Sequence, residues 1–139
     1  GRKPLLIVGI AGMALSLFAI SWAFSQESYN ARLVLIAIIG FVASFAISLG
    51  PVMWVLLPEI FPNEQRAAAI SVAGFWNALV SATVTMIFPW ALSTLGSGGT
   101  FLAFALFAAA ALLFVVLLVP ETKGRTLEQL ENDLLTAKA

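Results

Sequence analysis

The sequence predicts an all-α integral membrane protein with four membrane-spanning helices followed by a short amphipathic helix. Composition supports the first part, because 61% of the 139 residues are apolar, 10% are charged and the mean hydropathy is +1.03. A soluble domain of this length has too small a core to bury so much apolar surface. Charge spacing supports the second part, because the charged residues separate apolar stretches long enough for helices of about 20 residues.

The same composition excludes several functional classes. Seven basic residues balance seven acidic ones, and the chain contains no histidine and no cysteine. The balanced charge provides no general attraction for nucleic acid, and the missing residue types remove disulfides, thiolate metal sites and imidazole chemistry. The sequence also has no nucleophile paired with a base and no phosphate-binding loop. We therefore expect no enzyme activity, no cofactor, no metal site and no nucleic-acid partner.

The four predicted spans cover residues 4–24, 33–57, 67–92 and 101–119. A polar link at 25–30 separates the first two. Between Arg66 and Glu121 no charged residue occurs, and this stretch is too long for one membrane helix. It therefore divides in two at 93–100, where glycine and serine favour a turn.

The basic residues indicate the orientation of the spans. Six of the seven lie on one predicted face of the membrane, and only Arg32 lies on the other. By the positive-inside rule the richer face is cytoplasmic. We expect a multi-pass protein of the cell membrane, plasma or inner, with both termini and the link from Glu59 to Arg66 in the cytoplasm.

The tail at 120–139 is predicted to form the short cytoplasmic amphipathic helix. Thr126 and Gln129 have the spacing of a capping box, and the leucines around and after them recur on one helical face. We expect this helix to lie against the bundle or on the membrane surface.

Two spans carry small and polar residues at helical spacing. The face of the second span contains Gly40, Ser44, Ser48, Pro51 and Trp54. The face of the third contains Ser71, Gly74, Asn77, Ser81 and Thr85. Such faces either line a polar path or pack helices closely, and the spacing leaves both interpretations open. Asn77 favours the path, because its carboxamide has four hydrogen-bonding positions that hydrocarbon cannot satisfy.

The first and fourth spans have simpler interpretations. Gly9, Gly12 and Ser16 in the first span are predicted to form a helix-packing surface. The fourth span has no polar side chain and is expected to face lipid. Trp22 and Trp90, near the outer ends of their spans, are expected in the interfacial aromatic belt.

The Gly50-Pro51 pair interrupts the second span. Proline in a helix interior removes a hydrogen bond and clashes with the preceding turn, at a cost of about 3 kcal/mol. Transporters tolerate broken helices where protein or a water-filled cavity satisfies the freed backbone groups. We expect Pro51 to kink the helix, so that the half after it moves as a gate. Trp54, one turn later, is explained equally well by the interfacial belt and by stacking on a substrate.

Three motifs in this order resemble the sugar porters of the major facilitator superfamily, which include sugar/proton symporters and facilitative glucose transporters. They are Gly50-Pro51-Val52-Met53-Trp54, then Pro58-Glu59-Ile60-Phe61-Pro62 with Arg66, and finally Pro120-Glu121-Thr122-Lys123-Gly124-Arg125-Thr126-Leu127-Glu128. The resemblance covers essentially the whole chain. It implies that the spans are helices nine to twelve, from the C-terminal half of a twelve-helix fold. The absence of an initiating methionine agrees with a piece of a longer protein.

The resemblance also implies substrate-binding residues. Trp54 matches a tryptophan that lies beside the bound sugar, and Phe45 matches an aromatic residue five positions before the Gly-Pro pair. Asn77 matches an amide that forms hydrogen bonds with sugar hydroxyls. Ala78 follows Asn77 where the family commonly has a tryptophan, which weakens any statement about sugar choice.

Four charged residues resemble the family's inner charge network, which joins helix ends in one conformation and separates in the other. They are Arg2, Glu59, Arg66 and Glu121. Ordinary solvated loop charges are the alternative interpretation. Ala67 follows Arg66 where the family commonly has a glycine, which loosens the assignment of this loop.

The implied function is transport of a monosaccharide, hexose or pentose, by alternating access and with proton-coupled symport. The alternatives are facilitative uniport and a non-transporting sugar sensor. A sensor usually has a long cytoplasmic tail, whereas only 19 residues follow Pro120 here. An unrelated four-helix assembly protein has no support from these motifs. The expected partners are the sugar, protons, the lipid bilayer and the remaining helices of the parent transporter.

Overall fold

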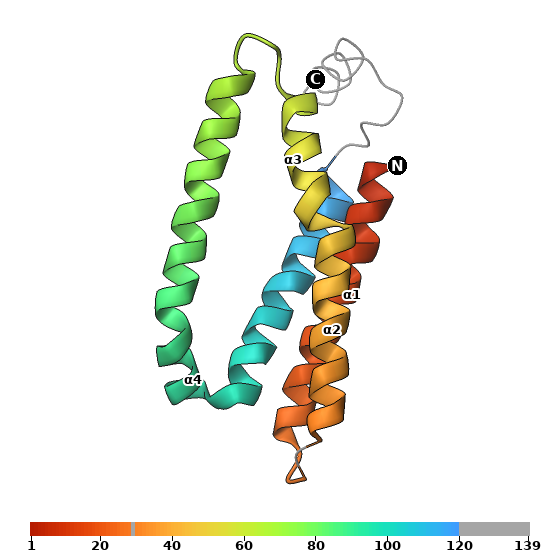
Figure 1. Ribbon diagram of the computed structural model, residues 1–139, viewed down its shortest axis with the longest axis vertical. Helices are drawn as coiled ribbons and strands as arrows, with labels where there is room; N and C mark the ends of the chain where they lie inside the picture. The colour runs from red at the N-terminus through yellow and green to blue at the C-terminus, as the bar shows by residue number, and fades with distance from the viewer. Residues whose placement is uncertain (29, 120–139) are drawn as a thin grey trace.

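The computed structural model describes residues 1–28 and 30–119, and this part of the chain is helical with short connections (Figure 1). Its helices are α1 (Arg2–Ser25), α2 (Ala31–Ile47), α3 (Leu49–Ile60) and α4 (Arg66–Leu118). The all-α prediction is confirmed for these residues. The predicted tail helix, with Thr126 and Gln129, lies outside the described residues.

Three helical stretches are long and apolar enough to cross a membrane. They are Arg2–Ser25, Ala31–Glu59 and Arg66–Leu118. The last has 53 residues, and a straight helix of that length would measure about 80 Å, more than twice the thickness of a bilayer core.

The α4 helix reverses direction near Gly96 instead of running straight (Figure 1). Gly96 has a φ of 72° and a ψ of 172°. Glycine adopts a positive φ without the steric cost that a Cβ imposes. This residue lies inside the segment 93–100, where the sequence favoured a turn. The count of four spans and their bounds stay predictions.

The α1 helix is the one against which the others pack (Figure 1). Its buried side chains include Leu6, Ile10, Met13, Leu17 and Ile20. Steps of three and four residues place these side chains along one face of the helix. In contrast, the first half of α4 stands apart from the bundle and leaves most of its side chains exposed (Figure 1).

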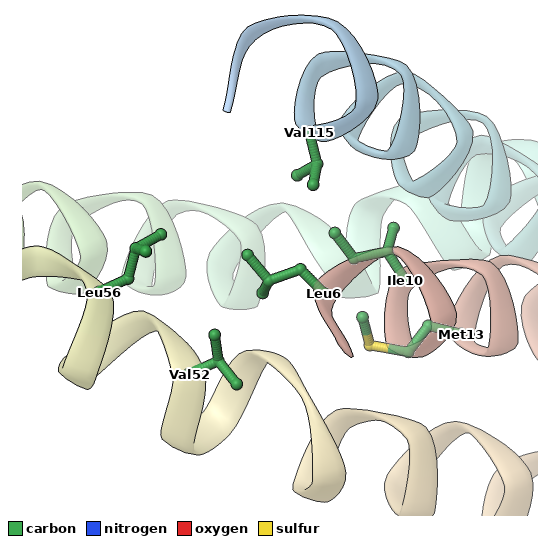
Figure 2. Close-up of a cluster of buried hydrophobic side chains, with 6 residues drawn as sticks. All are labelled: Leu6, Ile10, Met13, Val52, Leu56 and Val115. Atoms are coloured by element: carbon green, nitrogen blue, oxygen red, sulfur yellow. The ribbon is translucent and has the colours of Figure 1, made fainter. Parts of the chain in front are cut away.

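A cluster of buried apolar side chains joins α1, α3 and the end of α4, and Figure 2 shows these side chains pointing toward one another. Its members are Leu6, Ile10, Met13, Val52, Leu56 and Val115. Lipid tails are as apolar as these side chains, so the cluster stabilises the bundle by close packing rather than by removal from water. It holds one face of α3 against α1.

The backbone leaves helical geometry at Ser48, between α2 and α3. Ser48 has a φ of −117° and a ψ of −93°, and its N–H donates to the Phe45 carbonyl at 3.2 Å. Pro51 lies in the first turn of α3, where a missing N–H costs little. The break therefore lies three residues before Pro51. The physical reason is that the proline ring conflicts with the carbonyl of Ile47, four residues earlier.

Candidate functional site

Three residues that the sequence singled out for substrate binding lie around one cavity. Phe45 lies near the end of α2, Trp54 in α3 and Asn77 in the first half of α4, and together they line a cavity of about 270 Å³. The remaining lining residues are Leu49, Gly50, Met53, Leu57 and Ala73. The cavity is therefore formed by the broken helix pair on one side and by α4 on the other.

The break at Ser48 explains how two of these residues reach the same cavity. Phe45 and Trp54 are nine residues apart, and in a straight α-helix they would point about 180° apart. The non-helical backbone at Ser48 turns α3 about its own axis relative to α2, so side chains after the break no longer follow the helical spacing of those before it. A helical projection of the sequence would have placed the two aromatic rings on opposite faces.

The cavity has aromatic and aliphatic walls with one polar side chain, Asn77. Trp54 is 54% exposed and Phe45 is 47% exposed, so both rings are accessible to a ligand. Within the described residues, the Asn77 carboxamide forms no hydrogen bond. Its donors and acceptor are thus available to a ligand. This combination suits a small molecule with an apolar C–H face and several hydroxyl groups.

Gly50 keeps space open beside Phe45. A methyl group at Gly50 would lie 3.4 Å from the Phe45 carbonyl oxygen and 3.7 Å from its ring carbon Cε1. These are ordinary van der Waals distances, so alanine would fit the backbone at this position. The methyl would narrow the cavity without disrupting the helix.

The residues of the predicted polar face of the second span lie in two different environments. Gly40, Ser44 and Ser48 lie against α1, and Ser48 is 0% exposed. Trp54 lines the cavity instead. The packing interpretation that the spacing left open is therefore correct for the first three residues, and the path interpretation is wrong for them. The reason is again the break, because the projection assumed one straight helix.

On α1, the surface that packs against Gly40, Ser44 and Ser48 is the one predicted from the small residues of this helix. A Cβ at Gly9 would overlap the side chain of Ser48, and a Cβ at Gly12 would overlap the hydroxyl of Ser44. Close approach of two helix backbones requires this lack of side-chain volume. The prediction that Gly9, Gly12 and Ser16 form a helix-packing surface is confirmed.

The polar face predicted for the third span contributes only Asn77 to the cavity. The Ser71 hydroxyl donates to the Ala67 carbonyl at 2.9 Å, and the Thr85 hydroxyl donates to the Ser81 carbonyl at 2.8 Å. These hydroxyls are thus satisfied by their own helix. A Cβ at Gly74 would meet no atom within 4 Å in the described part of the chain.

Two of the four charged residues predicted to form a network contact each other. Arg2, in the first turn of α1, forms an ion pair with Glu59, in the last turn of α3. The exposed fractions of their side chains are 36% and 32%. A pair exposed to this extent contributes about 1 kcal/mol or less, so it can form and separate at low cost.

Among the described residues, Arg66 is not joined to this pair. Arg66 begins α4, and its Nε is buried without a hydrogen-bond partner among the described residues. Glu121 lies outside the described residues. The network as a whole therefore stays a prediction.

Sequence reasoning missed several residues that line the cavity. Ala73 lies one turn before Asn77, and Leu57 lies three residues after Trp54. Helical spacing from the two predicted residues would have found both of them. The contact between Gly9 and Ser48 had no comparable signal, because it joins two helices across an interface.

Comparisons with known proteins show the family to which the chain belongs. The family described as "Sugar (and other) transporter" matches residues 1–134. The D-xylose-proton symporter of Escherichia coli (strain K12) is 43% identical over 137 residues, which cover 94% of this chain and 28% of the relative. Probable polyol transporter 4 of Arabidopsis thaliana is 43% identical over 134 residues, which cover 94% of this chain and 26% of the relative.

Among solved structures, a double-tryptophan mutant of XylE matches with a TM-score of 0.86 and 39% identity over 95% of this chain and 29% of that one. The chain thus spans little more than a quarter of the relatives that it matches. The matched family consists of transporters and not enzymes. The chain belongs to the sugar porters of the major facilitator superfamily, a family of integral membrane proteins.

Proposed function

We propose that this chain is the C-terminal part of a longer carrier that transports a monosaccharide by alternating access and couples this movement to protons. The observation that supports it most is the cavity, where Phe45, Trp54 and Asn77 meet from two separate parts of the chain. A relative named as a D-xylose-proton symporter supports the substrate class and the coupling.

The cavity supplies both kinds of contact that a sugar needs. The C–H face of a sugar ring packs on the plane of Trp54 or Phe45, because both rings are large, apolar and accessible. The Asn77 carboxamide donates to one hydroxyl and accepts from another. A site that forms hydrogen bonds with substrate hydroxyls rejects analogues that lack them, because its own polar groups are then left unpaired.

The α3 helix connects the cavity to the ion pair between Arg2 and Glu59. It carries Trp54 on the cavity side and Glu59 in its last turn, where Glu59 meets Arg2 of α1. Movement of α3 about the break would therefore change the sugar site and the ion pair together. We propose that the end of the bundle with Arg2 and Glu59 faces the cytoplasm, and that this coupling closes that side in one state of the carrier.

The proton-binding group is proposed to lie elsewhere in the carrier. In the described structure the carboxylates are Glu27, Glu59 and Glu64, which lie in links or in the last turn of a helix. A coupling group in the middle of the membrane would be an acidic side chain facing the interior of the bundle. The remaining helices of the carrier would supply this group.

The test is uptake of labelled xylose, glucose and myo-inositol by the full-length carrier in proteoliposomes, with and without an inward proton gradient. We expect at least one sugar to accumulate only when the gradient is present. Equilibration that ignores the gradient would refute the proton coupling and leave a uniporter. Failure of every sugar to move or to bind would refute the carrier function.

A further inference from the structure

The first half of α4, residues 66–95, carries Asn77 and stands apart from the bundle (Figure 1). The cavity lies between its middle and α3. From Phe75 to Trp90 every side chain is exposed except that of Phe88, which is half-buried. The place of Asn77 in the cavity therefore depends on how this half of α4 is held, and Phe88 is the side chain of this stretch that packs against other residues.

At its turn, α4 is attached to α1. The Ser21 hydroxyl donates to the Gly98 carbonyl at 2.8 Å. A Cβ at Gly98 would lie only 3.1 Å from Ser25 Oγ, so α4 approaches α1 closely here. Next to this contact, the rings of Phe24 and Phe101 are stacked, with centroids 5.7 Å apart and an interplanar angle of 11°. The start of the second half of α4 is thus held on α1 by a hydrogen bond and by an aromatic pair.

Phe88 extends this attachment to the first half of α4. Its ring meets Phe101 edge-on, at a centroid distance of 6.3 Å and an interplanar angle of 74°. It also lies 6.0 Å from the Phe104 ring at an angle of 34°. Both distances are in the range of about 4.5–7 Å that aromatic pairs prefer, and such pairs have preferred orientations. Phe88 is therefore held against the second half of α4 and, through Phe101, against α1.

Phe88 and Asn77 project from the same side of α4. Phe88 follows Asn77 by three helical turns, which leaves the two side chains about 20° apart around the helix axis and about 16 Å apart along it. The non-helical residue of α4 is Gly96, which comes after both. Because side chains on a continuous helix keep their angular relation, any rotation or tilt of α4 at Phe88 also moves Asn77 relative to Trp54.

We propose that Phe88 is a positioning residue for sugar binding, because its contacts with Phe101 and Phe104 fix where the Asn77 carboxamide lies in the cavity. The inference rests on the proposed function, in which Asn77 forms hydrogen bonds with the sugar. If Phe88 served only the stability of the fold, its removal would lower the amount of folded carrier and leave the sugar Kd of the folded fraction unchanged. Sugar affinity therefore separates the two roles.

The experiment measures equilibrium sugar binding to purified, folded full-length carrier. We expect Phe88→Ala to raise the sugar Kd about fivefold, because hydrogen bonds weaken steeply when their geometry is lost. In a carrier that already has Asn77→Leu, the same substitution should change Kd by less than about twofold, since no amide remains to be misplaced. In a carrier that has Trp54→Ala, Phe88→Ala should still raise Kd about fivefold, because Trp54 belongs to α3 and the two effects add.

Phe107→Ala is the matched control. Phe107 is 74% exposed, also belongs to α4, and forms no ring contact among the described residues, so its removal should leave the sugar Kd unchanged. Phe88→Leu keeps an apolar side chain and protects the fold. It should raise Kd about threefold, and this increase should also disappear in the Asn77→Leu background.

Three results would overturn the positioning role of Phe88. They are an unchanged Kd in both Phe88 variants, an undiminished increase in the Asn77→Leu background, and an equal increase in Phe107→Ala. Absence of sugar binding in the unmodified carrier would instead refute the proposed function.

Discussion

Replacing Trp54 with alanine in the full-length carrier tests whether this ring binds the sugar or anchors the helix at the membrane interface. The ring is 54% exposed and lines the cavity. Taking about 250 Å² for a tryptophan side chain, roughly 135 Å² is accessible, and a sugar ring covers one face, or about 70 Å². At about 25 cal/mol per Å² this area contributes about 1.7 kcal/mol to binding.

That free energy corresponds to a loss of affinity of roughly 10- to 20-fold. The assay is equilibrium binding of the transported sugar to purified full-length carrier, with uptake measured in parallel. Trp54→Phe keeps an aromatic face and should lose less than Trp54→Ala. Trp22→Ala is the matched control, because Trp22 is also well exposed, at 61%, and does not line this cavity.

Two results would refute this reasoning. An unchanged sugar Kd in Trp54→Ala would mean that the ring belongs to the interfacial belt. An equal loss in Trp22→Ala would mean that removal of any exposed tryptophan disturbs the carrier, and that the cavity has no particular role. Measuring both variants by the same assay separates these two explanations.

Three further substitutions test the other parts of the site. Asn77→Leu keeps the side-chain volume and removes the hydrogen bonds, so sugar affinity should fall roughly tenfold. If the substitution weakened the binding of every deoxy sugar analogue equally, Asn77 would form no direct hydrogen bond with a particular hydroxyl. Glu59→Gln removes the ion pair with Arg2 and should change the ratio of inward-open to outward-open carrier by up to about fivefold, with little change in sugar Kd. If accessibility labelling showed no change in this ratio, the ion pair would not hold the carrier in one of its two states. Gly50→Ala narrows the cavity and should weaken hexose binding about tenfold more than pentose binding; an unchanged ratio would place Gly50 away from the sugar.

Much of the membrane architecture could be read from the sequence, because it depends on composition and on local backbone preferences. A chain with 61% apolar residues and 10% charged residues needs a lipid environment whatever its detailed packing. The reversal near Gly96 was also readable, since a long uncharged stretch must fold back and glycine permits the turn. These inferences need no knowledge of which helices touch.

The cavity residues were identified partly by resemblance and partly by chemistry. Asn77 was predicted because an amide in a membrane span needs a polar partner. Phe45 was predicted from the resemblance alone, since in a straight helix it would point away from Trp54. The structure brings the three residues to one cavity, and their role in binding a sugar stays a prediction.

The sequence by itself determined that this protein is a bundle of membrane helices with one interrupted span, because hydropathy and proline act locally. Only the tertiary structure decided where the interruption lies and which way each face points. A helical projection assumes one continuous helix axis. The single non-helical residue Ser48 changes the direction in which the side chains of α3 point relative to those of α2. The contact of Ser48 with Gly9 and the ion pair between Arg2 and Glu59 are likewise tertiary, because they join residues far apart in the chain whose distance depends on how the helices pack.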